Sequence, residues 1–329
     1  MNPRAPCLLA CIVTSILIAQ RPGGPPGAGG PPMRQHRAKE AAALTLVPAT
    51  EKPPGENEVR ILRRGPSLDI TSNALPDHLV GRFPNRGNPH HIEAQRYDFR
   101  LPADPQPAAQ TTWLHTQPAG ERGPPNMPFG IALNGVLFDP GTAEFWQGDR
   151  ALGWNYEALG GAVPLGLDAS HAHVQPGGVY HYHGLPTLLM DQLGLAADQH
   201  SPLIGWAADG FPIYALRGYK DPQDPASGMK TLRSSYDLKP GERPRPPKGP
   251  GGPHDGAFVQ DYVFIAGHGD LDECNGRFCV TPDFPRGVYA YFLTAEWPVI
   301  PRAFRGTPVV LRGAGGPGGP GRGKGSRPR

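Results

Sequence analysis

The sequence lacks the short motifs that mark several large enzyme classes. It has no His-Glu-x-x-His pair of a zinc protease, no Gly-x-Ser-x-Gly turn of a serine hydrolase and no phosphate-binding loop ending in Gly-Lys-Ser/Thr. A glycine pattern at 313–318 matches a dinucleotide-binding loop by its letters only, because it follows no strand-helix unit and lies in a Gly/Pro tail. These motifs therefore assign no reaction and no catalytic residue to the chain.

Cysteine is scarce, with four residues in 329. Cys7 and Cys11 lie in the N-terminal apolar run, so removal of that run leaves Cys274 and Cys279. We predict that these two form a short-loop disulfide, because oxidising compartments preserve such bonds and the intervening Asn-Gly can turn the backbone. A redox-active or metal-binding thiol pair is the alternative, although the spacing is not that of a thioredoxin-type motif.

Long hydrophobic runs are also missing. The N-terminal apolar run, residues 7–19, follows Arg4 and is too short to span a bilayer comfortably. It predicts a secretory signal peptide over residues 1–20 and a mature protein that is secreted, periplasmic or on the cell surface, with no transmembrane span. A lipoprotein-type cleavage box ending at Cys11 and an uncleaved membrane anchor are the alternatives.

Glycine and proline are abundant instead, with 45 and 43 residues. They crowd into residues 21–32, 240–253 and 313–329, where Pro removes hydrogen-bond donors and Gly raises the entropy cost of ordering. We expect these runs to be disordered. The organisation predicted is a linker at 21–43, one domain at 44–311 with a Pro/Gly-rich insert at 239–253, and a disordered basic tail at 312–329.

Positive charge belongs to the two ends of the chain. Of the net charge of +3, residues 1–40 contribute +4 and residues 312–329 contribute +5, which leaves −6 on residues 41–311. No aromatic residues interleave with the basic residues of the tails, so we expect no nucleic-acid partner. A solubilising or cell-wall-adhering role is the better interpretation of the tails.

Strand patterns are clearer than helical ones. Residues 130–140, 257–265 and 288–293 are rich in β-branched or aromatic residues and bounded by Gly, Pro or Asp, whereas helical periodicity is weak and confined to 187–195. Many short strands with frequent turns bury themselves best face to face. We therefore predict a mainly β fold, a two-sheet sandwich-like single domain.

The most specific pattern is a group of four histidines within 13 residues. Two His-x-His pairs, His171/His173 and His181/His183, flank the turn residues 176–178, and residues two apart in a strand share a face. A two-residue turn would place the pairs on opposite faces, whereas a three-residue type I loop with a bulge sets His173 against His181 and His171 against His183. We favour the second register, because Pro176 fits poorly the positive φ that the two-residue turns require.

Four imidazoles on one face predict a transition-metal site. Neutral imidazole suits copper, zinc, iron or nickel, and three or four such nitrogens with no thiolate disfavour calcium and magnesium. We therefore predict that His171, His173, His181 and His183 bind copper or zinc. The alternative is that they are surface or hydrogen-bonded strand histidines. His254 and His268 are further candidate ligands, for which an exposed loop position is the better interpretation.

Acidic residues suggest a second, weaker site. Asp270 and Asp272 could hold calcium with Asn275, but the run lacks the full EF-hand spacing, and a turn capped by these side chains is the alternative. Asp209 could orient a ligating imidazole or could simply start a turn, which we favour.

Residues 180–184, Tyr-His-Tyr-His-Gly, together with the preceding residues 171–176, resemble the signature of the YHYH domain family of exported, largely bacterial proteins. The similarity extends to residues 130–140, 204–214, 270–277 and 290–294, so it spans about residues 80–306. The resemblance implies export and a single domain, and it implies no particular reaction. The metal prediction comes from the histidine spacing.

Three functions are compatible with these observations. The first is an exported copper- or zinc-binding protein, and the second is a metal-dependent enzyme in which three histidines bind and an open position activates water or dioxygen near Tyr180 or Tyr182. A fourth imidazole nitrogen bound to the ion would favour a role in metal binding or transport. An exchangeable water molecule in that position would favour catalysis. The third is a metal-free surface or carbohydrate-binding module with aromatic platforms. The candidate platforms are Tyr180, Tyr182, Trp206, Tyr289 and Tyr291.

Overall fold

The computed structural model describes residues 37–114 and 128–311. These residues form mainly strands, turns and loops, with little helix. The prediction of a mainly β fold is therefore confirmed. The predicted signal peptide at 1–20, most of the linker and the tail at 312–329 lie outside the described residues, and the domain limits remain predictions.

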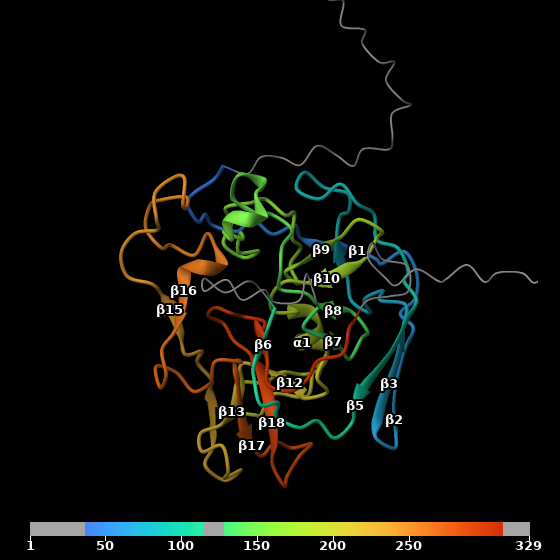
Figure 1. Cartoon of the computed structure of the whole chain (residues 1–329). Coiled ribbons are helices and arrows are strands. Elements are labelled where there is room, and N and C mark those ends of the chain that lie inside the picture. Colours follow the sequence, from blue (N-terminus) through green and yellow to red (C-terminus); the bar gives the residue numbers. More distant parts are fainter. Residues whose placement is uncertain (1–36, 115–127, 312–329) are drawn as a thin grey trace, which may run out of the picture. The chain divides into compact units, whose positions relative to one another are not determined.

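A mixed eight-stranded sheet carries the histidine hairpin. Its strands are β7 (Gly130–Ala132), β8 (Leu137–Phe138), β9 (Ala172–Val174), β10 (Tyr180–Tyr182), β11 (Gly205–Ala207), β12 (Pro212–Ala215), β17 (Gly276–Cys279) and β18 (Val288–Leu293). Their order is β17-β18-β12-β11-β7-β8-β10-β9, in which only β8–β10 and β12–β18 pair in parallel. The hairpin β9–β10 therefore forms one edge of the sheet (Figure 1).

A three-stranded antiparallel sheet packs against the large one. It consists of β2 (Val59–Arg64), β3 (Ser67–Ser72) and β5 (Tyr97–Pro102), which lie together in Figure 1. In β5 the alternate residues Tyr97, Phe99 and Leu101 are buried, as the two-residue period of a strand requires. They share one hydrophobic core with Ile131 and Phe138 of the large sheet. This face-to-face packing is the sandwich-like arrangement that the sequence predicts.

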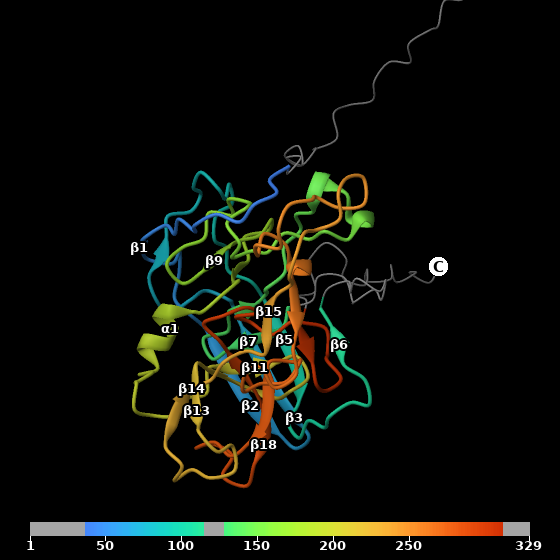
Figure 2. The same ribbon diagram turned by 90° about the vertical axis from the view of Figure 1, so that its left-hand side faces the viewer.

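Short two-stranded ribbons and helices complete the described part of the chain. The ribbons are β1 (Ala49–Glu51) with β4 (Val80–Gly81), β6 (Thr112–Trp113) with β19 (Ala303–Phe304), β13 (Arg217–Tyr219) with β14 (Met229–Thr231), and β15 (Tyr236–Leu238) with β16 (Tyr262–Phe264). The helices are α1 (Thr187–Gln192) and the 3-10 helices η1 (Trp146–Gly148), η2 (Arg150–Leu152) and η3 (Val259–Asp261). Figure 2 shows α1 and the β13–β14 ribbon. Within residues 37–114 and 128–311, no helix has the length and apolar character needed to cross a bilayer.

The three predicted strand segments have different outcomes. Residues 288–293 form β18 as predicted, and the weak helical pattern at 187–195 contains α1. Residues 130–140 form two strands rather than one, because the chain reverses at Asn134–Gly135, where Gly135 has a φ of 79°. Residues 257–265 contain η3 (Val259–Asp261), and only Tyr262–Phe264 of this segment form a strand, β16.

The disorder expected of the Gly/Pro run at residues 240–253 is wrong. Arg243 is fully buried there and forms ion pairs with Asp261 and Asp255. Its Nε donates to Asp261 Oδ1 at 2.7 Å, and its Nη1 donates to the Lys39 carbonyl at 2.6 Å. A buried guanidinium requires such partners, so this one side chain ties the insert to two other segments. A composition of glycine and proline does not reveal such an anchor.

The predicted disulfide is also wrong, because Cys274 and Cys279 are free thiols. The backbone turns at Asn275, with a φ of 55°, and then runs along β18 as β17. Cys274 packs in the core that contains Tyr291, whereas Cys279 packs in the cluster that contains Phe292. Consecutive residues of β18 point to opposite faces, so the two thiols lie on opposite sides of the sheet.

Candidate metal centre

The hairpin has the register that brings histidines together. His173 pairs with His181, and hydrogen bonds from Gln175 N to Val179 O (2.9 Å) and from Gly178 N to Gln175 O (3.0 Å) close a three-residue loop. The predicted register is therefore confirmed. The turn itself differs from the predicted type I, because Gly177 has a φ of 92°. Proline followed by a glycine of positive φ is the preference of a type II turn.

Three imidazoles, which we call the histidine triad, converge on this hairpin: His173, His181 and His183. The Nε2 of His183 lies 2.9 Å from that of His181 and 3.0 Å from that of His173. The three rings meet edge to face, with centroids 4.6 to 4.7 Å apart. Among the residues that the structure describes, this is the only group of three or more His, Cys, Asp or Glu side chains arranged to hold a metal ion.

Backbone carbonyls set which ring nitrogens carry protons. Nδ1 of His173 faces the Leu165 carbonyl at 2.9 Å, and Nδ1 of His181 faces the Val179 carbonyl at 3.1 Å. A carbonyl only accepts, so each Nδ1 is protonated and each Nε2 presents a lone pair. His183 can donate from its Nε2 to only one of these two nitrogens. The close approach of the three Nε2 atoms is therefore best satisfied by a cation between them.

Burial keeps the triad neutral. It lowers the pKa of His173 to about 3 and that of His181 to about 4. The pKa of His183 is also well below its ordinary value, because of burial and the neighbouring His173, His181 and Arg302. Metal ions bind the neutral imidazole, so at neutral pH protons compete little for these nitrogens.

The distances suit a small transition-metal ion. A tetrahedral zinc bound at 2.0–2.1 Å separates its nitrogen ligands by about 3.3–3.4 Å. The closest Nε2 separations in the triad, 2.9 and 3.0 Å, are within about half an ångström of that value. A small outward movement of the rings would reach it. Three imidazoles also leave one tetrahedral position for another ligand, as in catalytic zinc sites.

His171 does not belong to the triad, so the predicted four-histidine site is corrected to three. Its backbone has a φ of 53°, which is outside the strand region, and its ring Nδ1 contacts the Leu185 carbonyl at 2.9 Å. The side chain therefore leaves the face that the alternation predicts, although the backbone still pairs with His183 through the bond from His183 N to His171 O (2.8 Å). His171 instead lines a cavity of about 300 Å³.

The tyrosines of the motif lie on the other face of β10. Tyr180 donates to Asp168 Oδ2 at 2.7 Å, and the Tyr182 hydroxyl contacts Asn134 Nδ2 at 2.9 Å and His78 Nε2 at 2.7 Å. Both side chains are fully buried. Neither tyrosine can therefore assist chemistry beside the triad. The enzyme interpretation expected one of them to do so, and this expectation is wrong.

The aromatic platforms of the carbohydrate-binding alternative are mostly core residues. Tyr180, Tyr182, Tyr289 and Tyr291 are each at most 1% exposed, and only Trp206 is half-buried. A sugar ring cannot stack on a side chain that is closed off by the core. The structure therefore gives this alternative no platform from those four residues.

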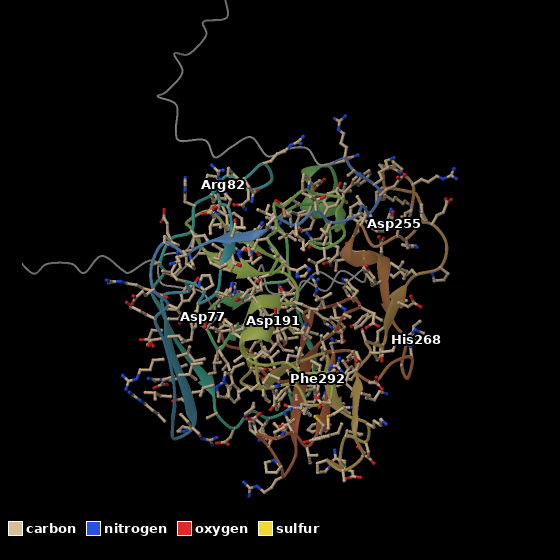
Figure 3. The ribbon with its side chains drawn as sticks, turned by 180° about the vertical axis from the view of Figure 1, so that it is seen from behind. Asp77, Arg82, Asp191, Asp255, His268 and Phe292 are labelled. Atoms are coloured by element: carbon tan, nitrogen blue, oxygen red, sulfur yellow. The ribbon has the colours of Figure 1, made fainter. Side chains whose placement is uncertain are left out.

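His254 and His268 are both loop histidines, but only His268 is exposed, as the preferred interpretation expected, whereas His254 is half-buried. His254 Nδ1 contacts the Gly241 carbonyl at 3.1 Å, and His268 Nε2 lies 3.7 Å from a carboxylate oxygen of Asp237. Neither residue joins the triad. Figure 3 shows His268 at the margin of the described fold.

The acidic run forms a turn rather than a calcium site. Asp270 pairs with Lys230, whereas Asp272 accepts hydrogen bonds from the backbone N–H groups of Cys274 (2.9 Å) and Gly276 (3.1 Å). These oxygens are engaged by different partners and do not converge on a common point. The turn interpretation is confirmed, and the calcium prediction is not.

Asp209 is likewise a turn residue, as preferred. Its carboxylate accepts from Phe211 N at 3.3 Å, and its Oδ2 also accepts from the Tyr291 hydroxyl at 2.6 Å and from Gly306 N at 2.8 Å. Burial raises the pKa of this carboxyl. Asp209 therefore ties β18 to the chain after β19 rather than orienting a ligating imidazole.

Two groups near the triad were not predicted from the sequence. Gln175 Nε2 lies 3.4 Å from His181 Nε2 and donates to Asp139 Oδ2 at 3.0 Å. Near His183, buried Arg302 donates to the Pro140 carbonyl at 2.7 Å and to Glu157 at 2.8 Å. Gln175 follows His173 by two residues, so strand alternation could have placed it on the histidine face. No local pattern predicts the Arg302–Glu157 pair.

Comparison with known proteins identifies a family for this chain. No curated protein and no solved structure matches the chain significantly. The family model described as YHYH protein matches residues 98–306, which is more than half of the chain and includes the whole histidine triad. On this match, and on the Tyr-His-Tyr-His hairpin that the structure shows, the chain belongs to the YHYH protein family.

Proposed function

We propose that the protein is an exported transition-metal-binding protein that holds copper or zinc through the Nε2 atoms of His173, His181 and His183. The observation that carries this proposal is the convergence of three Nε2 atoms, from the buried His181 and His183 and the half-buried His173. Those of His173 and His181 have fixed lone pairs and lie 3.0 and 2.9 Å from that of His183. A donor set of imidazoles without thiolate suits either ion. The N-terminal apolar run after Arg4 supports the export.

A metal-dependent enzyme is the second candidate, and one observation favours it. Three histidines converge rather than four, because His171 leaves the strand face. An ion held by three protein ligands keeps a position for water or substrate, which is how catalytic zinc sites differ from closed structural ones. The bound ion would act as a Lewis acid at that position.

The test is metal uptake by the purified full chain after treatment with a chelator. We expect one zinc or copper ion per chain by elemental analysis, and saturable binding by calorimetry. The double variant His181→Ala/His183→Ala should lose this binding, whereas His254→Ala, which removes a loop imidazole, should keep it. Absence of stoichiometric uptake by the wild-type chain, or unchanged uptake by the double variant, would overturn the proposal.

A further inference from the structure

The Gln175 side chain is the polar group from the hairpin loop that reaches the triad. Gln175 is half-buried and follows Val174 of β9, and its amide nitrogen lies 3.4 Å from His181 Nε2. That nitrogen atom of His181 is the one with the lone pair, because Nδ1 of the same ring faces the Val179 carbonyl. The amide therefore approaches the triad at the atom to which a metal ion would bind.

Asp139 fixes which end of the amide faces the triad. Its Oδ2 accepts from Gln175 Nε2 at 3.0 Å, and an ionised carboxylate can only accept. Turning the amide over would place its carbonyl oxygen against this carboxylate. Gln175 therefore keeps its nitrogen on this side, with one N–H on Asp139 and the second N–H directed toward the triad.

An ion bound by the triad changes the partner of that second N–H. An ion held by His173, His181 and His183 would use the His181 lone pair, and the Gln175 N–H would then need another acceptor. An oxygen ligand in the remaining position of that ion would supply one. A buried or half-buried donor left without an acceptor costs free energy, so the site favours a ligand that supplies one.

We propose that Gln175, held by Asp139, is a positioning residue that donates a hydrogen bond to a small oxygen anion, a hydroxide or a carboxylate, bound to the triad's ion. This inference rests on the proposed function, because it requires an ion on His173, His181 and His183. Asp139 is itself negative, so the amide between them separates the anion from that charge. The site would favour an oxygen ligand that accepts a hydrogen bond from the Gln175 amide. Formate, the smallest carboxylate, is the probe for such a ligand.

The test uses the full chain loaded with cobalt(II), whose visible absorption reports its ligands, and a titration with formate. Gln175→Leu removes the donor at similar size, and it should weaken formate binding about tenfold while cobalt uptake stays at one ion per chain. Asp139→Asn should weaken it in the same direction, because the amide loses the partner that orients it. The matched control is Gln95→Leu, since the Gln95 amide donates to the Gly177 carbonyl of the same hairpin and does not reach the triad.

The outcomes separate this inference from the proposed function. Equal formate affinity in the wild type and in Gln175→Leu would overturn the positioning role while leaving the metal site in place. Loss of cobalt binding in Gln175→Leu would also overturn it, because Gln175 would then be a metal ligand. Failure of the wild-type chain to bind cobalt, zinc or copper would overturn the proposed function, and this inference with it.

Discussion

The two His-x-His pairs of the hairpin have the same spacing but different structures. His181 and His183 flank Tyr182 of β10 and both reach the triad, whereas of the other pair only His173 does. The difference is the backbone at His171, whose φ of 53° takes it out of the strand conformation. Residues two apart share a face only where the intervening backbone is extended. The His-x-His spacing alone therefore does not show how many of the histidines can bind one ion.

Asp168 explains why the first pair begins in a turn. The backbone N–H of His171 donates to the Asp168 carbonyl at 2.8 Å, and the Asp168 side chain accepts from Ser170 N at 2.9 Å and from Ala172 N at 3.2 Å. Aspartate side chains commonly close such turns. Because Asp168 is completely buried and also accepts from Tyr180, the turn is anchored to the core, and it determines the direction of the His171 side chain.

Replacing one histidine from each pair separates the two pairs directly by their zinc affinity. His183→Ala removes the nitrogen that lies between the other two, and it should weaken zinc binding by about 100-fold or more, because even partners outside the ligand set change affinity by about 10–100-fold. His171→Ala removes an imidazole of the same hairpin and should leave zinc affinity within about threefold of the wild type. Calorimetry on both variants measures the contrast. Equal losses in the two variants would show that His171 is a ligand after all.

The second prediction concerns the stability of the chelator-treated chain against pH. Burial lowers the pKa of His181 to about 4 from the ordinary 6.5, so between these values the unfolded state binds more protons than the folded state. The stabilising contribution is complete above pH 6.5 and is lost as the pH falls toward 4, by roughly 3 kcal/mol for this one residue. Urea unfolding at pH 7, 5.5 and 4 measures the slope. His181→Leu should flatten it, and an equal slope in that variant would contradict the assigned cause.

The third prediction concerns the two glycines of the turn and their contributions to the free energy of unfolding. Gly178 has a φ of 80°, and a Cβ there would lie 2.4 Å from Glu93 Cβ and 2.9 Å from Glu93 N. Gly177 has a φ of 92° but has no atom within 4 Å of such a Cβ. Gly177→Ala should cost about 1 kcal/mol of unfolding free energy for backbone strain alone, and Gly178→Ala about 1–3 kcal/mol more for the clash. Chemical unfolding of both variants measures these losses. A smaller loss of unfolding free energy in Gly178→Ala than in Gly177→Ala would contradict the close packing of the turn on residue 93.

Local chemistry made part of the site predictable. The proline and glycines of residues 176–178 predict a three-residue loop, and this loop sets the register that places His173 against His181. The two-residue period of a strand then correctly places His183 on the same face as His181. The conformation of His171 depends on a buried aspartate that packs under Tyr180, and the sequence contains no local signal for that burial.

Features set by distant contacts were not predictable. Cys274 and Cys279 are close in sequence, but the path of β17 along β18 sends their side chains into two different clusters. Composition predicted disorder at 240–253, whereas the ion pairs of Arg243 hold that segment in place. Asp139 reaches Gln175 from 36 residues away along the chain. Each of these arrangements follows from packing between segments rather than from a repeat or motif.

X-ray absorption by the zinc-loaded full chain identifies and counts the atoms bound to the ion. We expect three imidazole nitrogens at about 2.0–2.1 Å, together with an oxygen ligand. His171→Ala should give the same spectrum, and His183→Ala should lose it. A shell with four imidazoles, a shell with sulfur, or a spectrum that survives in His183→Ala would contradict a metal centre built on His173, His181 and His183.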